Sequence, residues 1–135
     1  MIKIVYVGFG IVSQGLAEII LSTNSLLPIP EETEIQTVGI IDLMKGSKID
    51  ENGINMQEVL SNAENGDYSL LTDTIENVTK AIQEINADIV IEASFTDIKT
   101  GQPAISHIEA ALTSNKHVVT TNKGPFAVAY EEIFK

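Results

Sequence analysis

The sequence predicts a single α/β domain built on a doubly wound parallel sheet with helices on both faces. Strand-like apolar runs alternate with helical patterns along the 135 residues, and this alternation is typical of parallel strands joined by right-handed helical crossovers. The strand-like runs are continuously apolar, as expected for strands covered on both faces. A glycine-containing turn directly follows the first run. We expect the domain to span residues 1–135.

The elements of the first half follow from short apolar runs and the residues that interrupt them. Residues 2–7, IKIVYV, are rich in β-branched side chains and end at Gly8, which predicts a buried strand. Apolar side chains then recur at helical spacing, and two closely spaced prolines exclude regular structure further on. The predicted elements are a strand at 2–7, a helix at 10–22, a loop at 23–33, a strand at 34–41, irregular chain at 43–55 and a short helix at 56–64.

The second half continues the alternation. The run ADIVIEA predicts a third strand and KHVVTT a fourth. Pro103 stands where the start of a helix tolerates proline. The predicted elements are helices at 74–86, 104–114 and 125–134 and strands at 87–93 and 116–121.

The composition argues against several classes of function. Hydrophobic residues make up 44% and charged residues 20% of the chain, which indicates a folded globular protein. A net charge of −11 repels phosphate backbones, so no nucleic-acid partner is expected. No apolar stretch approaches the roughly 18 residues of a membrane span. The chain has no cysteine, which excludes disulfides, argues against a metal site and fits a cytoplasmic location.

The first strand–helix junction has the spacing of a nucleotide-binding turn. Gly8 permits a tight turn, and Gly10 lets the backbone approach a pyrophosphate without an intervening Cβ. Ser13 stands where the third glycine of the fingerprint is usual, and its small hydroxyl is expected to fit with slight loosening. The following helix would direct its first N–H groups at the phosphates. The alternative is a glycine turn with a purely structural role.

Asp42 ends the second predicted strand and is a candidate for binding the adenosine ribose. A carboxylate there accepts hydrogen bonds from ribose hydroxyls and repels a 2′-phosphate. Leu43 follows it, and the chain contains no arginine to bind such a phosphate. These residues favour NAD over NADP, although Lys45 and Lys48 lie nearby. The alternative is that Asp42 only caps a loop or a helix.

Two polar loops follow the third and fourth predicted strands. The first holds Ser94, Phe95 and Thr96, and the second holds Thr121, Asn122 and Lys123. Ligands of doubly wound sheets bind outside the carboxyl ends of the strands, so both loops are expected at the same crevice as the glycine turn. Lys123 could donate a hydrogen bond to a substrate oxygen or a cofactor ribose. The alternative is an ordinary surface lysine.

Three segments together resemble the amino-terminal, nucleotide-binding part of homoserine dehydrogenase. They are VGFGIVSQGLAEII, IDLMKGSKIDENGI and FTDIKTGQPAISHIEAALTSNKHVVTTNKGPFAVAYEEI, and the run TNKGP is the most specific piece. The resemblance implies a Rossmann-type fold, NAD or NADP as cofactor, and reversible reduction of L-aspartate 4-semialdehyde to L-homoserine in threonine and methionine biosynthesis.

The resemblance also implies roles for individual residues. The predicted cofactor-binding residues are Gly8, Phe9, Gly10, Ile11, Val12, Asp42, Ser94, Phe95, Thr96, Thr121, Asn122 and Lys123. Within this set, Ser94 and Thr121 would hold the nicotinamide half, and Lys123 would match the family's first catalytic lysine. Family members that prefer NADP tend to carry an arginine where this chain has Leu43, which again favours NAD.

The resemblance places the second catalytic lysine and the acidic substrate-binding residues in a later substrate domain, which also makes the homodimer contact. We expect this chain to end before that domain, to bind the cofactor, and to oxidise homoserine poorly or not at all, because hydride transfer needs an oriented substrate. Two alternatives stay open. One is a regulatory domain that binds NAD or an adenine nucleotide without catalysis, and the other is a different dehydrogenase with a similar nucleotide-binding half.

Overall fold

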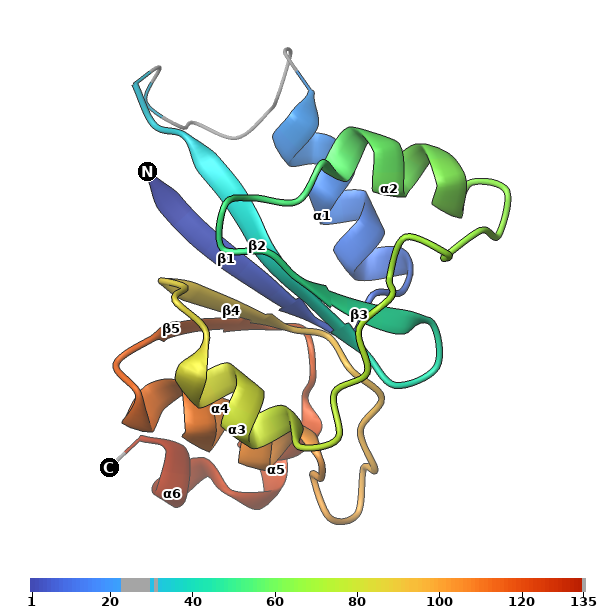
Figure 1. The fold of residues 1–135 in the computed structure, drawn as a ribbon. Helices are drawn as coiled ribbons and strands as arrows, with labels where there is room; N and C mark the ends of the chain where they lie inside the picture. Colours follow the sequence, from blue (N-terminus) through green and yellow to red (C-terminus); the bar gives the residue numbers. More distant parts are fainter. Residues whose placement is uncertain (23–29, 31, 135) are drawn as a thin grey trace.

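A five-stranded sheet forms the centre of the molecule in the computed structural model, which describes residues 1–22, 30 and 32–134. The strand order is β3-β2-β1-β4-β5 (Figure 1). The strands are β1 Ile2–Val7, β2 Ile35–Asp42, β3 Gly46–Ile49, β4 Ile89–Glu92 and β5 His117–Thr120. All neighbouring pairs are parallel except β2 and β3, which are antiparallel. The predicted doubly wound α/β fold is therefore confirmed, with an antiparallel edge strand added to it.

Helices cover both faces of this sheet, as the alternation predicted (Figure 1). On one face lie α1 Ile11–Leu21 and α2 Met56–Ala63, and on the other lie α3 Val78–Glu84 and α4 Ala104–Thr113. The short helices α5 Gly124–Val128 and α6 Tyr130–Ile133 follow β5 and contact α4. Within the described part of the chain, no helix combines the length and the apolar character needed to cross a membrane.

Strand β1 divides the hydrophobic core into two layers. Ile4 and Tyr6 pack into the cluster beneath α1 and α2, whereas Val5 and Val7 pack into the cluster beneath α3 and α4. All four side chains are buried, which is why the run IVYV shows no alternation of polar and apolar residues. Burial of each such side chain contributes about 1.5–3 kcal/mol to folding. The core therefore fixes the position of the turn that follows β1.

The prediction of irregular chain at 43–55 is wrong, because residues 46–49 form β3. The chain reverses after Asp42, and β3 pairs with β2 in an antiparallel register that places Gly46 opposite Asp42. A carboxyl oxygen of Asp73 accepts the N–H of Ile49 at 2.8 Å. Strand β3 therefore depends on pairing with β2 and on a residue 24 positions further along the chain. Its own polar residues show no strand pattern in the sequence.

Two of the predicted helices are shorter or divided. The helix expected at 74–86 begins only at Val78, because the side chain of Asn77 accepts the N–H of Lys80 and caps the first turn. The helix expected at 125–134 is interrupted at Ala129, whose φ of −130° and ψ of 31° are not helical. Most of the loop predicted at 23–33 lies outside the described residues.

Candidate functional site

A cavity of about 510 Å³ lies at the carboxyl ends of β1, β2 and β4. This is the edge of a doubly wound sheet at which ligands bind. The cavity is lined by Val7, Gly8, Phe9, Gly10, Ile41, Asp42, Leu43, Met44, Lys45, Val78, Ala93, Ser94, Phe95, Pro103 and His107. It therefore brings together the predicted glycine turn, Asp42 and the start of the first polar loop.

The two glycines of the turn play different parts. Gly8 has a φ of +87°, and a Cβ there would lie 2.5 Å from the carbonyl oxygen of Ala93, so the fold itself requires glycine. A Cβ on Gly10 would meet nothing within 4 Å, so the packing of the chain does not require glycine there. Gly10 is also the N-cap of α1, and no side chain caps this helix. The open space over Gly10 thus faces N–H groups suited to binding an anion.

A hydrogen bond from Ser13 connects helix α1 to the glycine turn. Its side chain is fully buried, and its hydroxyl donates to the carbonyl oxygen of Gly8 at 2.7 Å. Serine at the third fingerprint position therefore ties α1 to the turn, in place of the loosening that the sequence suggested. Such a buried bond contributes about 0.5–1.5 kcal/mol.

The three side chains next to the glycines do not all face the cavity. The ring of Phe9 is fully buried and packs edge-on against Tyr6, with 5.9 Å between the ring centroids. The ring of Phe9 is therefore part of the core, and its N–H donates to Asp42. The side chains of Ile11 and Val12 are exposed, and neither residue belongs to the cavity lining given above.

Asp42 connects the turn after β1 with the reversal after β2. One carboxylate oxygen accepts the N–H of Phe9 at 2.8 Å, and the other accepts the N–H groups of Met44 and Lys45, each at 2.9 Å. Burial raises the pKa of Asp42, but these backbone bonds and the charge of Lys45 together lower it below its usual value. A carboxylate offers about four acceptor positions. Asp42 therefore has the loop-capping role and still keeps capacity to accept a ribose hydroxyl.

Hydrophobic side chains and one lysine border the cavity next to Asp42. Leu43 and Met44 expose 78% and 96% of their surface, and both line the cavity. The ammonium group of Lys45 lies 5.6 Å from the centroid of the Tyr68 ring, within reach of a cation–π interaction. The aliphatic pair therefore offers apolar contact rather than charge at this edge.

The polar loops after β4 and β5 meet at a buried acid that the sequence did not single out. Glu92 is fully buried at the end of β4. Its Oε1 atom accepts the N–H of Ser94 at 2.9 Å, the hydroxyl of Ser94 at 2.5 Å and the amide of Asn122 at 2.9 Å. Its Oε2 atom lies 2.7 Å from Nδ1 of His107. The only sequence signal was an acidic residue at the end of an apolar strand.

The remaining predicted residues lie around these loops. Phe95 lines the cavity with 87% of its surface exposed, and Thr96 is half-buried. Thr121 and Lys123 are exposed and lie outside the cavity lining given above. Lys123 directly follows Asn122 and forms the N-cap of α5. The structure therefore brings Asn122 to the cluster around Glu92 and leaves Thr121 and Lys123 at its outer side.

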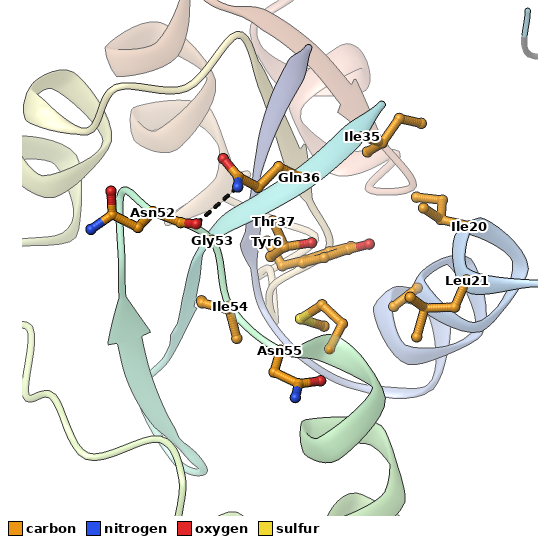
Figure 2. Close-up of a pocket in the computed structure, with 12 residues that line it drawn as sticks. Tyr6, Ile20, Leu21, Ile35, Gln36, Thr37, Asn52, Gly53, Ile54 and Asn55 are labelled. Atoms are coloured by element: carbon orange, nitrogen blue, oxygen red, sulfur yellow. Dashed lines mark hydrogen bonds between the residues drawn. The ribbon is translucent and has the colours of Figure 1, made fainter. Parts of the chain in front are cut away.

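A second cavity, of about 310 Å³, lies between the end of α1, the start of β2 and the start of α2 (Figure 2). Its lining is mainly apolar and amide side chains, and Gln36 donates to the carbonyl oxygen of Asn52 at 2.9 Å. Burial raises the pKa of Tyr6 to about 12, only partly offset by a hydrogen bond with Thr37, so the phenol stays protonated at neutral pH.

No His, Cys, Asp or Glu cluster suited to a metal occurs among the described residues. The cavity at the glycine turn is therefore the candidate site.

Comparisons with known proteins point to one family. No family model matches the chain. It is 33% identical to a homoserine dehydrogenase of Methanocaldococcus jannaschii over 98% of its own length. It is 35% identical to an NAD(+)-dependent homoserine dehydrogenase of Pseudomonas canavaninivorans over 97% of its length. The chain spans about 40% of the first relative and 38% of the second.

A solved structure agrees with this similarity. A hyperthermophilic archaeal homoserine dehydrogenase mutant in complex with NADPH matches with a TM-score of 0.77 and 26% identity. The match covers 98% of this chain and 39% of that protein, in its N-terminal part. The resemblance to the amino-terminal part of homoserine dehydrogenase is therefore confirmed over nearly the whole chain.

Proposed function

We propose that this chain is the nucleotide-binding part of a homoserine dehydrogenase, an enzyme that interconverts L-homoserine and L-aspartate 4-semialdehyde with NAD(H) or NADP(H). The observation that carries the proposal is the open space over Gly10, at an uncapped helix N-terminus and inside the cavity at the strand ends. This is the arrangement that binds a pyrophosphate. The similarity to enzymes of this name argues for catalysis and against a purely regulatory nucleotide sensor.

The residues present fit the cofactor along the length of the cavity. The first N–H groups of α1, next to Gly10, would bind the pyrophosphate, and Asp42 would accept a ribose hydroxyl. Ser94 lines the cavity, and Asn122 donates to its carbonyl oxygen at 3.1 Å, so these two residues would border the nicotinamide half. When bound, the nicotinamide supplies the hydride acceptor or donor of the reaction.

Lys123 is the proposed catalytic residue of this chain. Its side chain is exposed, and an ammonium group there would stabilise negative charge that develops on the substrate oxygen. Neighbouring Thr121 and Asn122, with Phe95 and Thr96 of the other loop, are proposed to border the nicotinamide and its ribose.

We propose NAD as the preferred cofactor. The lowered pKa of Asp42 keeps its carboxylate charged, and such a charge repels a 2′-phosphate. Leu43 supplies no positive charge beside it. One relative is named NAD(+)-dependent and the solved structure contains NADPH, so both cofactors occur among similar proteins. Leu43→Arg is expected to move the preference toward NADP.

The chain spans about 40% of the first relative, so the activity of a whole enzyme stays a proposal. A substrate domain, a homodimer and a cytoplasmic location stay predictions, and so does the expectation of no nucleic-acid partner, which rests on the net charge of −11. Calorimetric titration of the chain with NAD and with NADP tests the central proposal. Tighter binding of NADP would contradict the preference, and absence of binding by both would contradict the assignment.

A further inference from the structure

The strongest unexplained feature next to the site is the carboxyl group of Glu92. A buried carboxyl group is costly unless donors satisfy it, and this one is surrounded by three donors and a histidine ring nitrogen. Three donors converge on Oε1, two from Ser94 and one from Asn122, and the ring of His107 lies against Oε2. Because Glu92 is 0% exposed, it does not itself contact a ligand.

These contacts join segments that are distant in the sequence. Ser94 starts the loop after β4, Asn122 lies in the loop after β5, and His107 belongs to α4. Asn122 also donates to the carbonyl oxygen of Ser94 at 3.1 Å, so the two loops touch directly above the carboxyl group. The backbone of Glu92 adds a further link, because its carbonyl oxygen accepts the hydroxyl of Thr120 at 2.8 Å.

The cluster borders one end of the cavity and not the other. Ser94 and His107 line the cavity, whereas the pyrophosphate end is formed by Gly10 and α1. The backbone of β4 pairs with β1 beside the turn, and the N–H of Ala93 donates to the carbonyl oxygen of Val7 at 2.8 Å. Among the described residues, the carboxyl group of Glu92, in contrast, bonds only to Ser94, Asn122 and His107. A change in this carboxyl group should therefore disturb the two loops more than the turn, which the backbone pairing of β1 and β4 holds in place.

We propose that Glu92 is a positioning residue, which holds the loops after β4 and β5 at the separation needed to receive the nicotinamide half of the cofactor. The inference rests on the proposed function. Asn122 connects the loop after β5 to this carboxyl group. Because Lys123 is the next residue, the same hydrogen bond also restricts the position of the Lys123 backbone.

Two substitutions of Glu92 distinguish a role in holding the loops from a role in filling the core. Glutamine at this position keeps the shape of glutamate, and its carbonyl oxygen can accept from Ser94 and Asn122. Its NH₂ group would then donate to Nδ1 of His107, provided that the histidine proton sits on Nε2. Alanine at the same position removes every partner and leaves the donors unsatisfied. Glu92→Gln is therefore expected to rescue what Glu92→Ala loses.

The test compares the binding of NAD and of ADP by calorimetry on the complete chain. ADP reports on the glycine turn, and NAD reports in addition on the two loops. Glu92→Ala and Asn122→Ala should weaken NAD binding by about tenfold, the loss expected for one such contact, while ADP binding changes less than about twofold. Glu92→Gln should restore most of the NAD affinity. Ser114→Ala, which removes hydroxyl contacts at the far end of α4, is the control and should change neither.

The outcomes separate the two proposals. Equal losses of NAD and ADP binding, or unchanged NAD binding in both alanine variants, would overturn the positioning role while the proposed function stands. If the unaltered chain binds neither NAD nor NADP, the proposed function fails and this inference fails with it. If Glu92→Ala does not fold, unchanged NAD binding in Asn122→Ala would still overturn the positioning role, because Asn122 is the half-buried link between the carboxyl group and the loop after β5.

Discussion

Replacing Gly10 by valine should abolish cofactor binding and leave the fold intact. The backbone of Gly10 is extended, with a φ of −95° and a ψ of −156°, and a Cβ there meets nothing within 4 Å. Valine is a poorer N-cap than glycine, so the free energy of unfolding should fall by less than about 1 kcal/mol. Its side chain would fill the space over the helix N-terminus, and a pyrophosphate excluded from that space should lose at least about 100-fold in affinity, or 2.7 kcal/mol.

Gly8→Ala is the matched comparison, because it also adds a Cβ to the turn. In contrast to Gly10→Val, it is expected to destabilise the fold. The φ of +87° alone costs a residue with a side chain about 1–3 kcal/mol. The added Cβ would also lie 2.5 Å from the carbonyl oxygen of Ala93, and this clash adds to the cost. Urea denaturation measures the stability of both variants, and calorimetry with NAD measures binding. If Gly10→Val binds NAD like the unaltered chain, or if it unfolds while Gly8→Ala does not, the reasoning about the turn is refuted.

Three further predictions concern Ser13, Asp42 and the chain as a whole. Ser13→Gly should lower the free energy of unfolding by about 1–2 kcal/mol, because the bond to Gly8 is lost and glycine has a lower helix propensity. The NAD affinity should stay within a few-fold. A loss of affinity as large as that of Gly10→Val would contradict this. The pKa of Asp42 is lower in the folded chain than its ordinary value of 3.8, so its stabilising effect is full above that pH and is lost as acid protonates the folded carboxylate. The stability difference between the unaltered chain and Asp42→Asn should accordingly shrink as the pH falls below 3.8, in urea denaturation at a series of pH values, and a constant difference would count against it. The chain alone should form no substantial NADH from homoserine and NAD in an absorbance assay, and ready turnover would show that no later domain is needed.

The sequence predicted correctly those elements that are determined by residues close together in the chain. The continuous apolar run of β1 and the spacing of apolar residues in α1 are visible within a few residues of chain. Strand β3 was missed because Ser47 and Lys48 are polar, and the segment is a strand only through its pairing with β2. The start of α3 was misplaced because one side chain, Asn77, decides it.

The same distinction applies to the candidate site. Gly8, Gly10 and Asp42 were predicted because the turn they form is contiguous or follows a strand end, and the structure brings all three to one cavity. Glu92 was missed because its partners lie 15 residues away at His107 and 30 residues away at Asn122. Convergence of that kind is created by the topology of the sheet and carries no pattern along the chain.

Ser13 shows why the geometry of the turn, and not the letter at one position, defines this site. A third glycine in the fingerprint allows close approach of helix and strand, and a side chain at that position would ordinarily push them apart. Here the hydroxyl uses that closeness, because a donor 2.7 Å from the carbonyl oxygen of Gly8 requires the helix to lie near the turn. The bond also leaves the backbone N–H groups at the start of α1 free of side-chain caps. The altered residue therefore stabilises the position of the helix without using the groups that an anion would need.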